Sequence, residues 1–258
     1  MNRYSALTGL LLCAAVLSSC SYEKNGVQDI TAPAPASRLK FFNFGVNAPG
    51  VNFYANDAKM TAIVSGTGVE STTGTVYGGV GSGGFYDGVS PGQYNVAAKI
   101  AAATDKDLAI ATIPTTVGDG KYYSVYLSGF YNTAAKTVDG FVVEDPVPAI
   151  DYTVAYVRFV NAISNSSPMT LFAKNTVSAA ETALGGSTAY KAAGAFTALP
   201  EGVYDLNTRV AGSGANVITR TAVSFLAGRV YTIGARGDMT VVSTTATNRP
   251  FLDNTANR

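Results

Sequence analysis

The chain has no histidine and no tryptophan, and only two of its 258 residues are cysteines. Without histidine, a Ser-His-Asp triad, a Cys-His pair and a histidine-ligated zinc or iron site are excluded within the chain. Tryptophan, which often forms stacking platforms for sugars, is missing as well. We therefore expect a protein that is not an enzyme, with no catalytic residue, no metal site and no cofactor.

Charge is also scarce. Charged residues make up 14% of the chain, with 18 Lys and Arg against 17 Asp and Glu, and no basic cluster is present. A neutral chain lacks the positive surface that binds nucleic acid. Gly79–Gly84 fits the pattern G-x-G-x-x-G, but the next residues, Phe85–Val89, do not have a helical pattern, and a dinucleotide site needs a helix there. We expect neither a nucleic-acid nor a nucleotide partner.

The amino terminus has the order of a secretory signal. Arg3 is followed by the apolar stretch Ala6–Leu17, which is shorter than the roughly 20 residues that span a membrane. Leu17-Ser18-Ser19-Cys20 resembles the lipobox of bacterial lipoproteins. That resemblance implies cleavage of residues 1–19 and acylation of Cys20, for example with palmitate. We expect an envelope protein anchored in the outer membrane through this lipid, on its periplasmic or surface-exposed side.

The rest of the chain divides by composition. Residues 20–37 contain the Pro/Ala stretch Ala32–Ala36 and are predicted to be a flexible tether. Two β-domains are expected at residues 38–146 and 150–245, separated by a proline-containing linker, and residues 246–258 are expected to be a C-terminal tail.

The two expected domains are related by an internal repeat. Matching blocks occur in the same order in both halves, with offsets that drift slowly, as insertions in loops produce. The matched pairs are Lys40–Asn43 with Arg158–Asn161, Val51–Ala55 with Met169–Ala173, Pro91–Val96 with Glu201–Leu206, and Gly120–Val125 with Gly228–Ile233.

Each repeat is rich in Tyr, Phe, Val and Thr with glycine turns, which favours β-strands. The length and the spacing of turns predict an all-β fold of two tandem immunoglobulin-like or transthyretin-like β-sandwich domains, each with about seven short strands.

The repeat blocks resemble the domain of unknown function 4397 (DUF4397) family of bacterial cell-envelope proteins. The resemblance rests on Arg158–Ala162, Glu201–Tyr204 and Gly228–Thr232 in the second repeat, and on corresponding blocks in the first. Asn161 stands where many members have histidine, and Asn43-Phe44 departs from the expected Asn-Ala. The family implies a β-sandwich envelope module without an assigned activity.

Three residues are candidate binding residues, beside the lipidated Cys20. Arg158 and Asn161 lie in a repeat block, and Tyr86 lies in a loop rich in glycine and aromatics. On an alternating strand, Arg158 and Val160 face one side, while Phe159 and Asn161 face the other. A buried asparagine needs partners, so the simpler interpretation of Asn161 is a structural bond to a loop backbone.

We consider three classes of function. The first is a non-enzymatic lipoprotein whose β-sandwich modules interact with envelope proteins or adhere to other surfaces. The second is a glycan-binding accessory lipoprotein of an uptake or cell-wall system. The third, and least favoured, is a glycosidase with two carboxylates, because no spacing of the five glutamates nominates a pair.

Overall fold

The computed structural model describes residues 36–63 and 66–258, which lie in one compact unit. Its regular structure is eighteen strands and one 3-10 turn, η1 (Gly81–Gly84), so the expected all-β class is confirmed. No helix in the described part of the chain has the length and apolar character to cross a membrane. The expected signal peptide, Cys20 and most of the tether lie outside the described residues.

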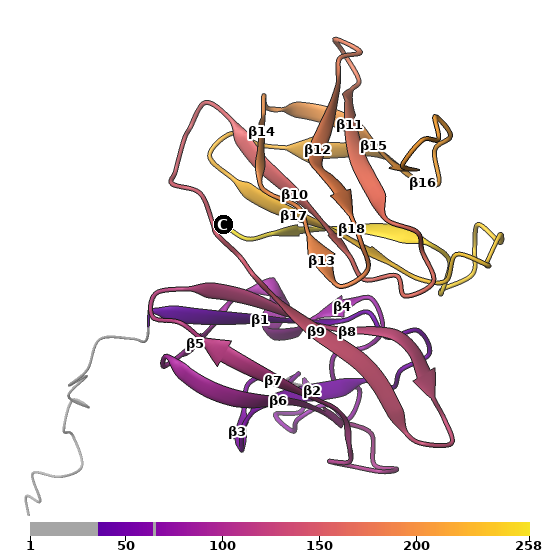
Figure 1. Ribbon diagram of the computed structural model, residues 1–258. Helices are drawn as coiled ribbons and strands as arrows, with labels where there is room; N and C mark the ends of the chain where they lie inside the picture. The colour runs from indigo at the N-terminus through magenta and orange to yellow at the C-terminus, as the bar shows by residue number, and fades with distance from the viewer. Residues whose placement is uncertain (1–35, 64–65) are drawn as a thin grey trace, which may run out of the picture. The chain divides into compact units, whose positions relative to one another are not determined.

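The first half of the chain forms the N-terminal sandwich, made of two facing sheets (Figure 1). The first sheet runs in the order β4 (Gly79–Val80), β1 (Ser37–Asn43), β8 (Tyr122–Asn132), β9 (Thr137–Glu144), with β5 (Asp87–Val89) beside β1. The second runs β3 (Ala58–Lys59), β2 (Val51–Ala55), β6 (Gly92–Ile100), β7 (Ala109–Val117).

The second half forms the C-terminal sandwich on the same plan. Its first sheet runs β13 (Ala192–Ala193), β10 (Ala155–Asn161), β17 (Val230–Arg236), β18 (Phe251–Ala256), with β14 (Thr197–Leu199) beside β10. Its second runs β12 (Glu181–Thr188), β11 (Met169–Asn175), β15 (Gly202–Val210), β16 (Ile218–Phe225).

The predicted tandem repeat is confirmed by this topology. In each sandwich, the first strand pairs in parallel with a later strand, β1 with β8 and β10 with β17, and a last strand completes the sheet in antiparallel orientation. Each sandwich has nine strands rather than about seven, because two or three of them are only two or three residues long.

The carboxyl terminus differs from expectation. Residues 246–258 were expected to be a tail, but Phe251–Ala256 forms β18 and pairs with β17 from Tyr231 to Arg236. In the N-terminal sandwich, β9 has the same place beside β8. The segment was missed because Phe-Leu-Asp-Asn-Thr-Ala lacks the alternation of apolar and polar residues that marks a strand.

Each sandwich has its own core between its two sheets. In β1, Leu39 and Phe41 belong to the N-terminal core. Lys40 and Phe42 lie on the opposite face of the strand, yet both are at most 1% exposed. Burial of both faces means that another layer covers the outside of this sheet.

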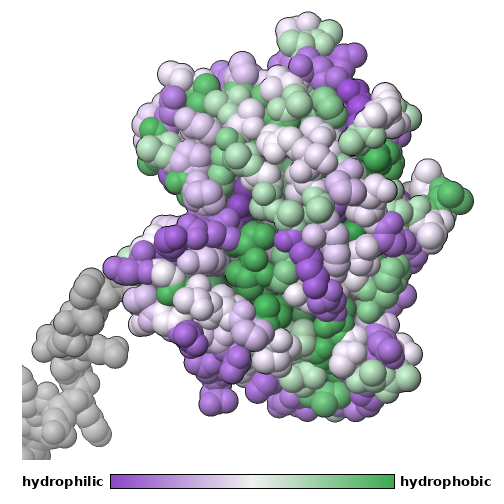
Figure 2. Space-filling model, in the orientation of Figure 1, coloured by the Kyte–Doolittle hydropathy of each residue, from purple (hydrophilic) through white to green (hydrophobic). Residues whose placement is uncertain are grey.

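The solvent-facing surface has mixed polarity. On the face shown in Figure 2, hydrophobic patches are interrupted by hydrophilic residues. Several large apolar side chains are nevertheless well exposed, among them Phe85 at 76%, Tyr152 at 80% and Val242 at 94%. Single exposed apolar residues are normal on a protein surface, so their significance depends on what surrounds each one.

Candidate functional site

The layer that covers β1 is the first sheet of the C-terminal sandwich. A third buried apolar cluster joins side chains of β1, β8 and β9 to Val160 and Ala162 of the second half. In it, the Tyr126 ring stacks on Phe42 with centroids 4.4 Å apart and on Phe141 at 5.1 Å. The two sandwiches therefore share a buried apolar interface, which restricts their relative motion.

A glycine permits part of this contact. Gly234 in β17 occupies the position that corresponds to Tyr126 in β8. A Cβ at Gly234 would lie only 2.8 Å from Cε2 of Phe44. The absence of a side chain at Gly234 therefore lets the Phe44 ring approach the sheet of the other sandwich.

A buried ion pair lies next to the apolar cluster. Arg158 is 1% exposed and donates through Nη2 to Asp145, which follows β9 and is 2% exposed. Arg158 also donates from Nε to Thr232 Oγ1 at 3.0 Å and from Nη1 to the Glu144 carbonyl at 3.0 Å. Every nitrogen of this guanidinium is thus engaged inside the protein, as a buried charge requires.

Tyr86 shares the same carboxylate. Asp145 Oδ2 accepts hydrogen bonds from the Tyr86 hydroxyl at 2.6 Å and from Ser124 Oγ at 2.7 Å. Burial, followed by the negative charge of Asp145, raises the pKa of Tyr86 above its ordinary value. The phenol consequently stays protonated and acts as a hydrogen-bond donor.

Lys40, the repeat counterpart of Arg158, completes this network. Its Nζ donates to the Ala256 carbonyl at 2.8 Å and to Asn257 Oδ1 at 3.3 Å, and it lies 4.2 Å from the centre of the Tyr86 ring. Desolvation lowers the pKa of Lys40 to about 8, with Asp145 opposing the shift and Arg158 adding to it. The lysine ties the N-terminal sandwich to the end of β18.

The structure thus brings Arg158 and Tyr86 together, through Asp145, in a structural network. The predicted alternation is confirmed, because Phe159 lies in the C-terminal core and Val160 in the interface cluster. Asn161 lies apart from the network.

Asn161 makes structural bonds. Its Nδ2 donates to Ser166 Oγ at 2.9 Å and to the Thr188 carbonyl at 3.2 Å, and its Oδ1 accepts from the Ile163 amide. Asn43 makes the same kind of structural bond in the first repeat, because it donates to the loop carbonyls of Pro49 and Thr75.

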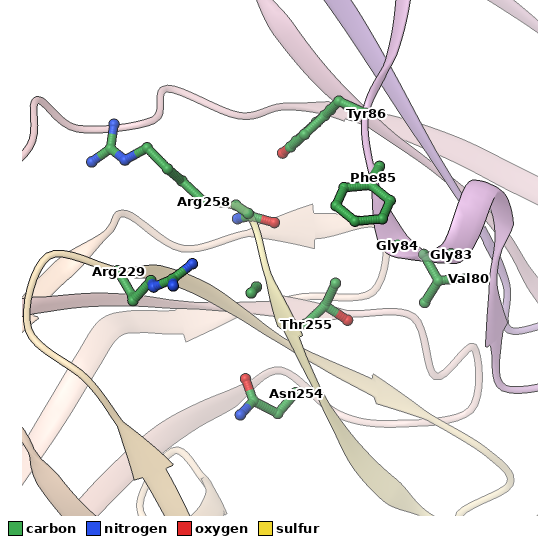
Figure 3. A pocket seen from close by; sticks show the side chains of 11 residues that line it. Val80, Gly83, Gly84, Phe85, Tyr86, Arg229, Asn254, Thr255 and Arg258 are labelled. Atoms are coloured by element: carbon green, nitrogen blue, oxygen red, sulfur yellow. The ribbon is translucent and has the colours of Figure 1, made fainter.

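A cleft of about 630 Å³ opens beside the network, lined by both sandwiches. Val80 and Gly83–Tyr86 line it from the N-terminal sandwich, and Arg229 and Asn254–Arg258 line it from the C-terminal sandwich. Figure 3 shows Tyr86 and Phe85 on one side, with Arg229 and Arg258 opposite them. Among the described residues, the lining contains no Asp or Glu side chain.

The glycine-rich motif forms one wall of this cleft. Ser82, Gly83 and Gly84 have φ values of 50°, 64° and 87°, so three successive residues have left-handed backbone. Such a turn favours glycine and is followed by an extended Phe85 and then by β5. The G-x-G-x-x-G match therefore lacks the following α-helix that a dinucleotide site needs.

Arg229 and Phe85 were missed by the sequence analysis, which treated both as parts of strand and loop patterns. Arg229 is exposed, and within the described residues its guanidinium has no hydrogen bond or ion pair. Its repeat counterpart Lys121 forms an ion pair with Glu144 at 3.0 Å. The sequence offered no signal for this difference, because the ion pair of Lys121 joins two strands of the folded sheet.

The described residues contain no group of three or more His, Cys, Asp or Glu side chains placed to hold a metal ion. The groups available at the cleft are guanidinium, aromatic, hydroxyl and amide groups. Such groups can donate hydrogen bonds to a ligand or pack against it.

The sequence pattern of a known family, the domain of unknown function DUF4397, matches residues 37–172. This match covers more than half of the chain. The chain belongs to the DUF4397 family. The match includes the whole N-terminal sandwich and continues into β10 and β11, so the family's sequence signature extends into the second repeat. No curated protein matches the chain.

Proposed function

We propose that this DUF4397 protein is a non-enzymatic, lipid-anchored protein of the cell envelope that presents its joined β-sandwiches for interaction or adhesion. The observation that carries the proposal is the cleft between the sandwiches, where Arg229 is unpaired within the described residues and Phe85 is 76% exposed. Exposed aromatic and arginine side chains are enriched where proteins bind partners.

The buried network supports a binding role. Arg158, Tyr86 and Lys40 are held by internal partners, so they act as a frame for the cleft. A frame of this kind fixes the cleft before a ligand arrives, which reduces the ordering cost of binding. Acid–base catalysis on a substrate would need two titratable side chains that point into the cleft.

The anchor in this proposal is Cys20, at the end of the lipobox-like Leu17–Cys20. A durable anchor takes about two lipid signals, which diacylglycerol and an amide-linked acyl chain would provide. In intact cells, a clickable palmitate analogue is expected to label the wild-type protein and not Cys20→Ser. Labelling of Cys20→Ser would contradict the anchoring part of the proposal.

The interaction itself is tested by photo-crosslinking in intact cells. Benzoylphenylalanine at position 85 is expected to capture a discrete envelope component. The same group at position 242, which is 94% exposed and outside the cleft, is the matched control. Equal yields at both positions, or no adduct at either, would contradict a binding role for this cleft.

The second candidate function is a glycan-binding accessory lipoprotein. The observation that favours it is the size and polarity of the cleft, since about 630 Å³ lies within the range of roughly 300–1,000 Å³ typical of small-ligand sites. Binding of oligosaccharides by the full chain would support it, whereas capture of an envelope protein at position 85 without sugar binding would support adhesion between proteins.

A further inference from the structure

The side chains that line the cleft carry a net positive charge. The chain as a whole is almost neutral. Arg229 and Arg258 both line the cleft, and no Asp or Glu among the described residues does so. Guanidinium groups bind carboxylates and other planar or tetrahedral anions with directed hydrogen bonds. The charge therefore selects an anionic ligand.

The arginines retain donors for such a ligand. The Arg229 guanidinium has no partner in the described residues. Arg258 uses Nη1 to reach the Pro148 carbonyl at 2.9 Å, but its buried Nε has no hydrogen bond. Asn254 Oδ1, on the same wall, is likewise buried and without a partner. Because both of these atoms are buried, the exposed guanidinium of Arg229 is the donor that a ligand in the cleft can reach.

Phe85 provides an apolar surface beside these charges. Its ring is 76% exposed and is placed by the left-handed turn of Ser82, Gly83 and Gly84. Figure 3 shows the ring across the cleft from Arg229 and Arg258, and Thr255 of β18 also lines the cleft. A flat apolar ring next to hydroxyl and guanidinium groups matches a ligand with an apolar face, hydroxyl groups and an anionic substituent.

We propose that the cleft binds an anionic saccharide, with the sugar ring against Phe85 and its anionic group on Arg229. This inference rests on the proposed binding role and specifies its ligand. The shared chemistry is a sugar with a carboxylate or a sulfate substituent. The volume of about 630 Å³ accommodates a short oligosaccharide segment.

The test is isothermal titration of the full chain in detergent micelles with three oligosaccharides of equal length. An oligogalacturonate carries carboxylates, a heparin-derived oligosaccharide carries mainly sulfates, and a cellulose-derived one is neutral. We expect at least one of the two anionic ligands to bind about tenfold more tightly than the neutral one. Added salt should weaken this binding.

Two cleft variants and two matched controls identify the site. Arg229→Gln and Phe85→Ala are each expected to weaken anionic binding by about tenfold. Lys174→Gln removes an exposed positive charge outside the cleft, and Phe130→Ala removes a ring that is 46% exposed outside it. Both controls should stay within about twofold of wild type. Because Arg229 and Phe85 are exposed, their variants should keep the wild-type circular dichroism spectrum.

Several results would overturn the inference. They are equal binding of neutral and anionic ligands, equal losses in the cleft and control variants, and no binding of either anionic ligand. In the last case, continued capture of an envelope protein at position 85 would leave the proposed function standing. Loss of both saccharide binding and cross-linking would remove the inference and the interaction role together.

Discussion

The two repeats share one topology, yet their outward faces have diverged where they meet. Tyr126 in β8 corresponds to Gly234 in β17, and the ring on one side packs where the other side has no side chain. Lys40 corresponds to Arg158, but only Arg158 has a buried carboxylate partner. The two sheets are similar, and different side chains on their outer faces fit together where they meet.

A second divergence lies at the cleft. Lys121 is neutralised by Glu144, whereas its counterpart Arg229 is left without a partner among the described residues. The N-terminal sandwich also contributes the glycine-rich turn that carries Phe85. The two repeats therefore differ at this position, because the Lys121 charge is paired on the surface and the Arg229 charge has no such pair among the described residues.

The largest expected effect is on the buried pair. Arg158→Ala leaves Asp145 buried without its cation, and we expect the free energy of unfolding to fall by about 3–5 kcal/mol. Lys40→Met at neutral pH removes a desolvated charge whose hydrogen-bond partners are neutral, and should change stability by less than about 1.5 kcal/mol. Urea denaturation measures the free energy of unfolding of both variants. Equal losses of stability would contradict the prediction that Arg158 contributes more than Lys40.

The next effect concerns the glycine in β17. Gly234→Ala places a Cβ 2.8 Å from the buried Phe44 ring, and we expect it to cost about 1–3 kcal/mol. Gly214→Ala is the control, because nothing lies within 4 Å of the added Cβ. Thermal unfolding should separate the two variants. If Gly234→Ala and Gly214→Ala unfold at the same temperature, the close packing of the Phe44 ring on Gly234 is contradicted.

The third effect depends on pH. The folded protein has the pKa of Lys40 at about 8, below the usual 10.5. Between these values the unfolded chain binds more protons, so stability rises with pH. We expect a rise of about 1 kcal/mol from about pH 8 to pH 9, where tyrosines of the unfolded chain are still mostly protonated. Lys40→Met should remove this rise in stability. An unchanged rise in that variant would mean that another titratable group causes it.

The sequence predicted much of this fold and little of the site. The matched blocks Lys40–Asn43 and Arg158–Asn161 were enough to identify two core strands and, with the other blocks, the repeat. Alternation along Arg158–Asn161 placed Asn161 on the same face as Phe159. It also predicted the structural bonding of Asn161. These features are local, since they depend on which residues share one face of a strand.

The rest depends on contacts between distant residues. Nothing near Lys40 in the sequence indicates that it meets Ala256, and the weak pattern of Phe251–Ala256 concealed β18. Phe85 and Arg229 become neighbours across the cleft only after the two sandwiches pack together. A site made by joining two repeats cannot be read from either repeat alone.

We propose that the cleft between the repeats binds an envelope component through Arg229, which has no acidic partner among the described residues. The most direct measurement is the yield of cross-linked product from benzoylphenylalanine at position 85 in intact cells, compared between Arg229→Gln and Lys121→Gln. We expect Arg229→Gln to reduce the yield several-fold and Lys121→Gln to leave it unchanged. Equal yields in the two variants would contradict it.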